Sequence, residues 1–170
     1  MKLSVKEVVI FSILGAIMYV SKLVMEFLPN VHLVGVFVVA LTVVYRKKAL
    51  YPIYVFVMLT GLFSAFSTWW IPYLYVWLIL WGATMLIPRN IKPSFKPLLY
   101  MTVCGLHGLL YGTLYAPVHM LLFRMSFKGM LAWIAAGFGW DIVHAVGNFF
   151  CGFLICPIIT AIKTGEKYIG

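Results

Sequence analysis

Charged residues are scarce in this chain, and their scarcity excludes an ordinary water-soluble domain. Only 10% of the 170 residues are charged, whereas 64% are hydrophobic and the mean hydropathy is +1.05. A typical soluble domain carries roughly a quarter charged residues. Because hydrophobic runs recur from one end of the sequence to the other, we predict a single membrane domain over residues 1–170.

Motifs for redox, zinc and nucleotide chemistry are missing as well. Cys104, Cys151 and Cys156 lie in apolar segments, and no two of them have the two-residue separation of a redox or zinc motif. No phosphate-binding loop is present, since the nearest glycine-lysine context, at 165–167, lacks the preceding glycine-rich loop. We therefore predict structural thiols, no metal site, no cofactor and no nucleotide hydrolysis by this chain.

The sequence has instead six apolar segments, separated by charge clusters and by proline, glycine and asparagine. They cover approximately 5–28, 31–45, 49–66, 71–87, 98–123 and 140–162. A spanning helix needs about 20 residues; the second segment is shorter, but omitting it would place the basic run 46–48 at the wrong depth. We predict an all-α integral membrane protein with six transmembrane helices, the first of them a retained span rather than a cleaved signal peptide.

The basic residues predict how these helices are oriented. Of the 13 lysines and arginines, ten fall on one side of a six-span topology, two on the other, and Lys22 lies within the first span. The ten are Lys2, Lys6, Arg46, Lys47, Lys48, Arg89, Lys92, Lys96, Lys163 and Lys167. By the positive-inside rule, both termini are cytoplasmic. Their scatter in small groups is not typical of a nucleic-acid-binding face.

The remaining two, Arg124 and Lys128, belong to an external connection before the sixth span. Residues 126–133 begin polar and continue apolar, which predicts a short helix lying at the membrane interface. Such a helix can cap an external cavity.

Asp141, His144 and Asn148 form the densest polar group, at positions i, i+3 and i+7 of the sixth span. A helix places them on one face. We predict that this face contacts a ligand; the alternative is a hydrogen-bond network that joins neighbouring helices.

A second row, on the fifth span, recurs every four residues: His107, Tyr111, Tyr115 and His119. We predict ligand contact for Tyr115 and His119 near the external end, satisfied packing for His107, and a bend near Pro117. A parallel row of small side chains predicts close helix packing. It comprises Cys104, Gly108, Gly112 and Ala116.

Aromatic residues are concentrated at the outer end of the fourth span. Trp69, Trp70 and Tyr73 are candidates for stacking on a flat, nitrogen-containing or cationic ligand, while about half of the rings in this segment are expected to anchor the interface.

Glu26, at the outer end of the first span, and Asp141 are candidates for contacting the same ligand as the aromatic rings through their carboxylates. The alternative for Glu26 is an ion pair with Lys22, which lies four residues away on the same helix, so that the two can neutralise one another. Just beyond the first span, Asn30 and His32 add polar groups to the external mouth.

Residues 28–35, the aromatic external segment and residues 138–141 (Phe-Gly-Trp-Asp) accompany the six-span plan. In these features the chain resembles the substrate-binding subunits of energy-coupling factor transporters. The resemblance covers nearly the whole chain. It implies a high-affinity binder of a small vitamin-like micronutrient in a prokaryotic cell membrane, working with a transmembrane coupling subunit and two cytoplasmic ATPases.

The resemblance also implies a small-residue patch on the first helix for docking the coupling subunit. Ser12, Gly15 and Ala16 have the corresponding spacing, with serine in the first place, although packing within the chain explains the same residues. Two other functions stay open: an intramembrane enzyme with Asp141 and His144 as an acid–base pair, and a ligand-free scaffold. Polar groups collected in the outer half of the bilayer favour binding.

Overall fold

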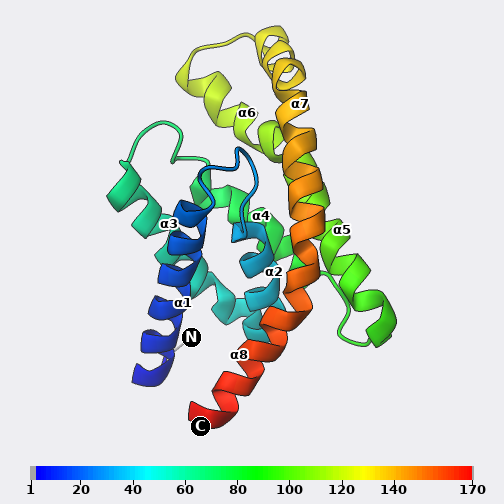
Figure 1. Ribbon diagram of the computed structural model, residues 1–170. Coiled ribbons are helices and arrows are strands. Elements are labelled where there is room, and N and C mark those ends of the chain that lie inside the picture. The colour runs from blue at the N-terminus through cyan, green and yellow to red at the C-terminus, as the bar shows by residue number, and fades with distance from the viewer. Residues whose placement is uncertain (1–2, 170) are drawn as a thin grey trace.

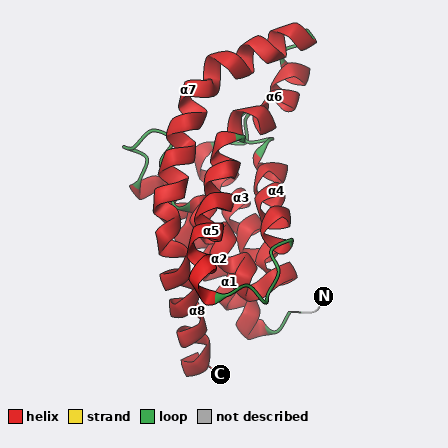
Figure 2. Ribbon diagram, turned by 90° about the vertical axis from the view of Figure 1, so that its right-hand side faces the viewer, coloured by secondary structure: helices red, strands yellow, loops and turns green. Residues whose placement is uncertain are grey.

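The structure is a computed structural model that describes residues 3–169, all of whose regular elements are helical (Figure 1, Figure 2). Lys2, counted above among the inner basic residues, lies outside the described residues. The helices are α1 (Val5–Val24), α2 (Val34–Tyr45), α3 (Leu50–Ser64), α4 (Tyr73–Met85), α5 (Lys96–Leu109), α6 (Tyr111–Leu122), α7 (Phe127–Cys151) and α8 (Ile155–Ile169), with 3₁₀ turns η1 (Arg46–Ala49), η2 (Pro93–Phe95) and η3 (Gly152–Leu154).

Within residues 3–169, three helical runs are long and apolar enough to cross a membrane. They are Val5–Val24, Pro93–Leu122 and Phe127–Lys167, and Tyr73–Met85 is a shorter apolar helix. The prediction of an all-helical chain with membrane-spanning helices is thus supported at this level. At 1.5 Å per residue, the 12 residues of α2 reach only about 18 Å, which is why length alone does not qualify this helix.

Helix α2 is the centre of the fold. Nearly every residue from Val34 to Thr42 is buried, because its sequence is apolar on all sides and such a helix must be surrounded by others. Gly35 lets neighbouring helices approach: a Cβ there would lie 3.0 Å from the Cys104 sulfur of α5 and 3.7 Å from the Asn148 amide of α7. The shortest of the predicted spans is thus the helix that is most completely enclosed.

Small residues bring α5 and α6 against α7, as the row of small side chains predicts. A Cβ at Gly108 would lie 2.8 Å from the His144 carbonyl oxygen, and one at Gly112 would lie 2.5 Å from an Asp141 carboxylate oxygen. Cys104 and Ala116 are buried in the same row. This packing prediction is confirmed, and it brings the polar face of α7 close to the backbone of α5 and α6.

The helix that carries Asp141 begins earlier than predicted. Residues 127–133 are the first turns of α7 rather than a separate interfacial helix, so the predicted break before the sixth span is wrong. The sixth span was predicted to begin at residue 140, directly after Gly139, but a glycine in a helix costs only about 1 kcal/mol, less than leaving backbone groups unpaired in an apolar environment. Ser126 caps this helix by accepting a hydrogen bond from the Gly129 N–H at 3.1 Å.

A break does occur one pass earlier, at Leu110, between α5 and α6. The sequence pointed to Pro117 as the disturbance, yet Pro117 lies inside α6. The interruption at Leu110 frees the N–H groups of the first turn of α6, and one of them is used by Asp141, as described below.

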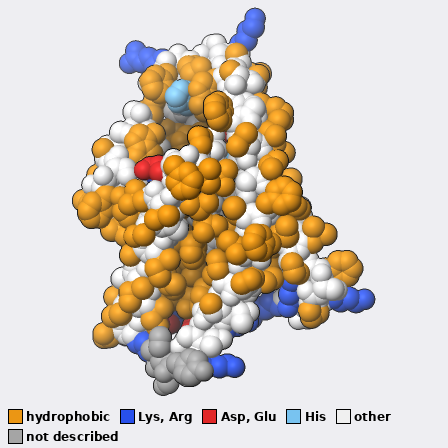
Figure 3. All heavy atoms as spheres, viewed as in Figure 1, with side chains coloured by type: hydrophobic (Ala, Val, Ile, Leu, Met, Phe, Trp, Pro, Cys, Tyr) orange, Lys and Arg blue, Asp and Glu red, His pale blue; other side chains and the backbone are white. Residues whose placement is uncertain are grey.

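Charged side chains lie toward the two ends of the molecule. Figure 3 shows hydrophobic side chains across the middle of one face and lysine and arginine side chains at its upper and lower edges. Both ends of the described chain lie at the end opposite the α6–α7 connection (Figure 1). There Lys48 forms an ion pair with Glu7, whose side chain also completes a capping box with Ser4.

Candidate functional site

A polar cavity of about 300 Å³ lies where the connection 25–33 meets α1, α4, α6 and α7. The connection 25–33, which contributes to its lining, follows α1 at the end of that helix away from the N-terminus (Figure 1). Six of the thirteen residues that line the cavity carry aromatic or imidazole rings. Its lining comprises Lys22, Met25, Glu26, Leu28, Pro29, Asn30, Val31, His32, Trp69, Tyr73, Tyr111, Tyr115 and His144.

The inner wall of the cavity is a cluster of rings in mutual contact. The His32 and His144 rings lie edge to face with centroids 4.9 Å apart, and His144 contacts Tyr111 at 4.5 Å. Tyr111 in turn lies 4.9 Å from Tyr115. Edge-to-face contacts of this kind orient the rings, so the rings that line the cavity are held in fixed positions.

Two ring nitrogens in this cluster have no hydrogen-bond partner among the described residues. They are Nδ1 of His32 and Nε2 of His144, both buried, and the His144 side chain is only 2% exposed. Leaving a buried polar atom unpaired costs about 1–3 kcal/mol. A bound molecule that pairs with these nitrogens would recover that cost.

His32 is neutral in this setting. It lies in the connection before α2, and burial lowers the pKa of its imidazole to about 4, with the nearby Lys22 ammonium acting in the same direction. A neutral imidazole offers one donor and one acceptor nitrogen. The ring can therefore hydrogen-bond an uncharged polar group at neutral pH.

Below the cavity, Trp77 joins the cluster by contacting His32 at 5.9 Å and His107 at 5.6 Å. His107 Nε2 lies 3.0 Å from the Val76 carbonyl oxygen, to which it must donate because a carbonyl only accepts. The predicted satisfied packing of His107 therefore holds for Nε2 only, because His107 Nδ1 and the neighbouring Trp77 Nε1 are buried without a partner among the described residues.

Asp141 lies on the predicted polar face, but its carboxylate accepts a hydrogen bond from the backbone of a neighbouring helix. Oδ1 accepts a hydrogen bond of 2.9 Å from the Gly112 N–H in the first turn of α6, and Asp141 is not among the residues that line the cavity. A carboxylate is favourable at a helix N-terminus, where N–H groups are unpaired. The arrangement makes Asp141 an N-terminal cap for α6 supplied by another helix.

Asn148, the third member of the face, is fully buried beneath the cavity. Neither atom of its amide has a partner among the described residues, and its Nδ2 lies close to the Gly108 and Gly35 backbones. Of the predicted polar stripe, therefore, the structure brings His144 alone to the cavity wall.

The aromatic segment divides in a similar way. Trp69 and Tyr73 line the cavity with ring centroids 5.6 Å apart, and the Tyr115 hydroxyl donates to the Trp69 carbonyl oxygen at 3.2 Å. Trp70 instead points to α3, where its indole N–H donates to the Val57 carbonyl oxygen at 2.8 Å. Trp70 is thus held against α3 and, unlike Trp69 and Tyr73, does not line the cavity.

At the mouth, Lys22 and Glu26 form the predicted ion pair, with Nζ and Oε1 separated by 3.2 Å. The Lys22 side chain is 15% exposed, whereas that of Glu26 is 63% exposed. Asn30 is exposed and adopts a left-handed backbone conformation, with φ of 58°, that turns the connection over the cavity. The pair leaves the formal charges of the mouth balanced.

His119 lies in a second, smaller cavity of about 200 Å³ that shares Trp69 and Tyr115 with the first. Its ring stacks on Trp133 with centroids 4.5 Å apart. The α6 part of the predicted row therefore lines both cavities. The hydrogen bond between Tyr115 and Trp69 lies between His119 and the two imidazoles of the first cavity.

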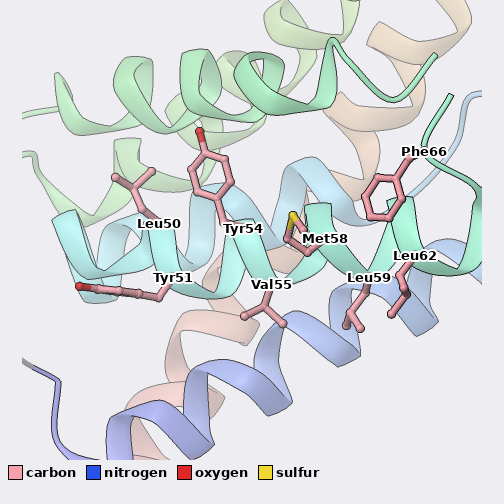
Figure 4. A pocket seen from close by; sticks show the side chains of 8 residues that line it. All are labelled: Leu50, Tyr51, Tyr54, Val55, Met58, Leu59, Leu62 and Phe66. Carbon is pink, nitrogen blue, oxygen red and sulfur yellow. The ribbon is translucent and has the colours of Figure 1, made fainter. Parts of the chain in front are cut away.

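A larger hollow of about 700 Å³ is an open apolar groove along α3 (Figure 4). Figure 4 shows its leucine, methionine and aromatic side chains; no histidine or acidic residue lines it. A groove without placed polar groups lacks the features that orient a specific ligand. The cavity lined by His32 and His144 is therefore the better candidate for a ligand site.

The predicted docking residues of α1 point in different directions. Gly15 packs inside the chain, since a Cβ there would lie 2.5 Å from Val55 and 2.8 Å from the Pro52 carbonyl oxygen of α3. Ser12 is exposed, and Ala16 lines an apolar groove of about 480 Å³ on the outer side of α1.

Sequence reasoning missed the depth of His32 and the role of Tyr111. His32 was assigned to the mouth because it follows Asn30, yet its ring turns inward against His144. Tyr111 was seen in the four-residue row without being chosen. The spacing signal was present for Tyr111, whereas no local pattern reveals that a loop histidine meets a ring from α7.

Two imidazoles alone do not make a metal site. Within residues 3–169 no group of three or more histidine, cysteine or acidic side chains is close enough to hold a metal ion. The pair is better suited to hydrogen-bonding an organic molecule.

Comparison of the chain with known protein families, curated proteins and solved structures finds no match.

Proposed function

We propose that this protein is the substrate-binding subunit of an energy-coupling factor importer, which captures a small vitamin-like or nitrogen-heterocyclic micronutrient at the external face of a prokaryotic cell membrane. The observation that carries the proposal is the cavity lined by His32 and His144. In an otherwise apolar molecule, it gathers rings and unpaired polar nitrogens at one end. Such groups are costly in a membrane protein unless they have a function.

The proposed topology has six passes: α1, α2, α3, α4, α5 with α6, and α7 with α8. Both termini are cytoplasmic in this proposal, because nearly all lysines and arginines outside the spans then face inward. The cavity faces outward, toward the end where Arg124 and Lys128 lie. Cysteine variants at Lys128 and Lys47 test this: a membrane-impermeant thiol reagent should label intact cells at position 128 and spare position 47.

Uptake would require partners, and we propose a transmembrane coupling subunit with two cytoplasmic ATPases. The exposed side of α1, with Ser12 and the apolar groove at Ala16, is the proposed docking surface. Gly15 contributes indirectly by seating α1 on α3. Replacing Ala16 with leucine should weaken co-purification of the coupling subunit, while the same change at Val9, an exposed residue of α1 outside the groove, should not.

The enzyme alternative is less well supported. An acid–base pair needs Asp141 and His144 to act on a shared substrate. One Asp141 oxygen is held by the Gly112 N–H, and only His144 reaches the cavity. A ligand-free scaffold would leave the unpaired nitrogens of the cavity unexplained.

The proposal is tested by purifying the protein in mild detergent and extracting any bound small molecule for mass spectrometry. We expect a micronutrient-sized compound that is lost from a His144→Phe variant and retained by a Val143→Ala variant, since Val143 is exposed on the same helix. Absence of a bound compound, together with no association with a coupling subunit, would contradict the transporter function.

A further inference from the structure

The charge balance of the cavity narrows the kind of molecule it can hold. Lys22 and Glu26 are the only formally charged residues in its lining, and they are paired at 3.2 Å. Asp141, which the sequence offered as a partner for a cationic ligand, does not line the cavity: its Oδ1 accepts from the Gly112 N–H, and its Oδ2 is buried without a partner among the described residues. The inner wall thus presents no unpaired charge to a ligand, and a net charge buried there would have no counter-charge.

The polar chemistry of the inner wall is that of two imidazole rings. Nδ1 of His32 and Nε2 of His144 are buried without partners, and the rings lie 4.9 Å apart. Each free nitrogen is a donor or an acceptor according to the tautomer of its ring. An amide-like edge carries a donor next to an acceptor. It satisfies the two nitrogens when one of them donates and the other accepts, whichever ring supplies the donor.

The size and the walls of the cavity complete the description. At about 30 Å³ per molecule of water in the liquid, a cavity of about 300 Å³ holds on the order of ten non-hydrogen atoms. Trp69, Tyr73 and Tyr115 supply ring faces around it. Aromatic walls favour a flat ligand, because offset and edge-to-face contacts with a planar ring are favourable.

We propose that the cavity binds an uncharged, single-ring nitrogen heterocycle whose amide-like edge hydrogen-bonds the free nitrogens of His32 and His144. This inference rests on the proposed function and specifies its substrate class. Pyrimidine bases and pyridine carboxamides have this size, planarity and edge. A doubly ringed or permanently charged vitamin does not.

The test uses two sets of matched probes on the purified protein, freed of bound compounds, with binding measured by calorimetry. Nicotinamide is compared with its anionic isostere nicotinate and its cationic derivative 1-methylnicotinamide, and uracil is compared with its anionic carboxylate, orotate. We expect nicotinamide or uracil to bind at least about tenfold tighter than its charged counterparts. Tighter binding of a charged member, or no binding of either neutral probe, would overturn the inference.

Variants test the residues named. His144→Phe keeps a ring but has no nitrogen, so it should lose binding of the neutral probe by about tenfold, and His144→Gln should recover part of it because an amide also donates and accepts. Val143→Ala is the folding control. If His144→Phe unfolds, Glu26→Gln provides an independent measurement: it leaves Lys22 unpaired and should shift relative affinity toward nicotinate, and an unchanged preference would count against a charge-balanced cavity.

Failure of this inference can be told apart from failure of the proposed function. A co-purified compound that is charged or clearly larger than a single ring would overturn the uncharged-heterocycle inference while leaving a substrate-binding subunit intact. Binding of a neutral probe without any association with a coupling subunit would support the inference and contradict the transporter function.

Discussion

The imidazole rings of His32 and His144 meet edge to face, with centroids 4.9 Å apart and planes inclined at 77°. One ring comes from the connection after α1 and the other from the middle of α7, so their contact ties together distant parts of the chain. Each ring leaves one buried nitrogen without a partner. The pair defines the inner wall of the cavity and is the feature on which the proposed function depends.

Tyr115 links this wall to the aromatic segment, which leads to a first prediction. Tyr115→Phe removes the hydroxyl that donates to the Trp69 carbonyl oxygen and accepts from Tyr111. We expect probe affinity to fall about three- to tenfold, in line with the loss of one net hydrogen bond of about 1 kcal/mol. Calorimetry checks this; a variant with wild-type affinity would show that the Trp69 position does not depend on the bond.

Close packing of α5 on α7 leads to a second prediction. Gly108→Ala would place a Cβ 2.8 Å from the His144 carbonyl oxygen, a backbone atom that cannot move alone. Overpacking of this kind costs about 1–3 kcal/mol, and we expect a lower thermal transition in detergent. Gly137→Ala is the matched control: nothing lies within 4 Å of its Cβ position, so the transition should stay the same or rise.

Asp141 is the subject of a third prediction. Asp141→Asn keeps an oxygen that can accept from the Gly112 N–H, whereas Asp141→Ala removes it. We expect the alanine variant to be less stable by about 1 kcal/mol, the usual worth of a helix cap, and the asparagine variant to be nearly unaffected. Thermal melting and calorimetry with the neutral probes are measured together. If Asp141→Asn melts normally but no longer binds, Asp141 touches the ligand directly.

The burial of His32 predicts how stability depends on pH. The pKa of His32 falls from its ordinary 6.5 to about 4 on folding. Between these values the unfolded state binds more protons, so stability rises with pH across this window, by up to about 1.4 kcal/mol per unit, and levels off above it. His32→Gln should flatten the dependence of the melting temperature between pH 5 and 7. Parallel curves for the two proteins would show that another group controls it.

Particular residues show how far sequence reasoning could go. The Lys22–Glu26 pair and the small-residue row were predicted correctly, because both depend on spacing along one helix. His144 was chosen for the same reason. The prediction of a separate helix at 126–133 was wrong. A glycine such as Gly139 has a low helix propensity, but that alone does not decide whether a helix surrounded by apolar groups is interrupted.

The sequence by itself determined the apolar character and the secondary structure: hydrophobic runs with few charges form helices, and three helical runs among the described residues are long and apolar enough to cross a membrane. Helical periodicity also placed Asp141, His144 and Asn148 on one face. Tertiary structure decided what that face does. The break at Leu110 presents an unpaired N–H that binds Asp141, close packing encloses Asn148, and only His144 meets a ring from the α1–α2 connection. Contacts between distant segments depend on how helices pack, and no local pattern encodes them.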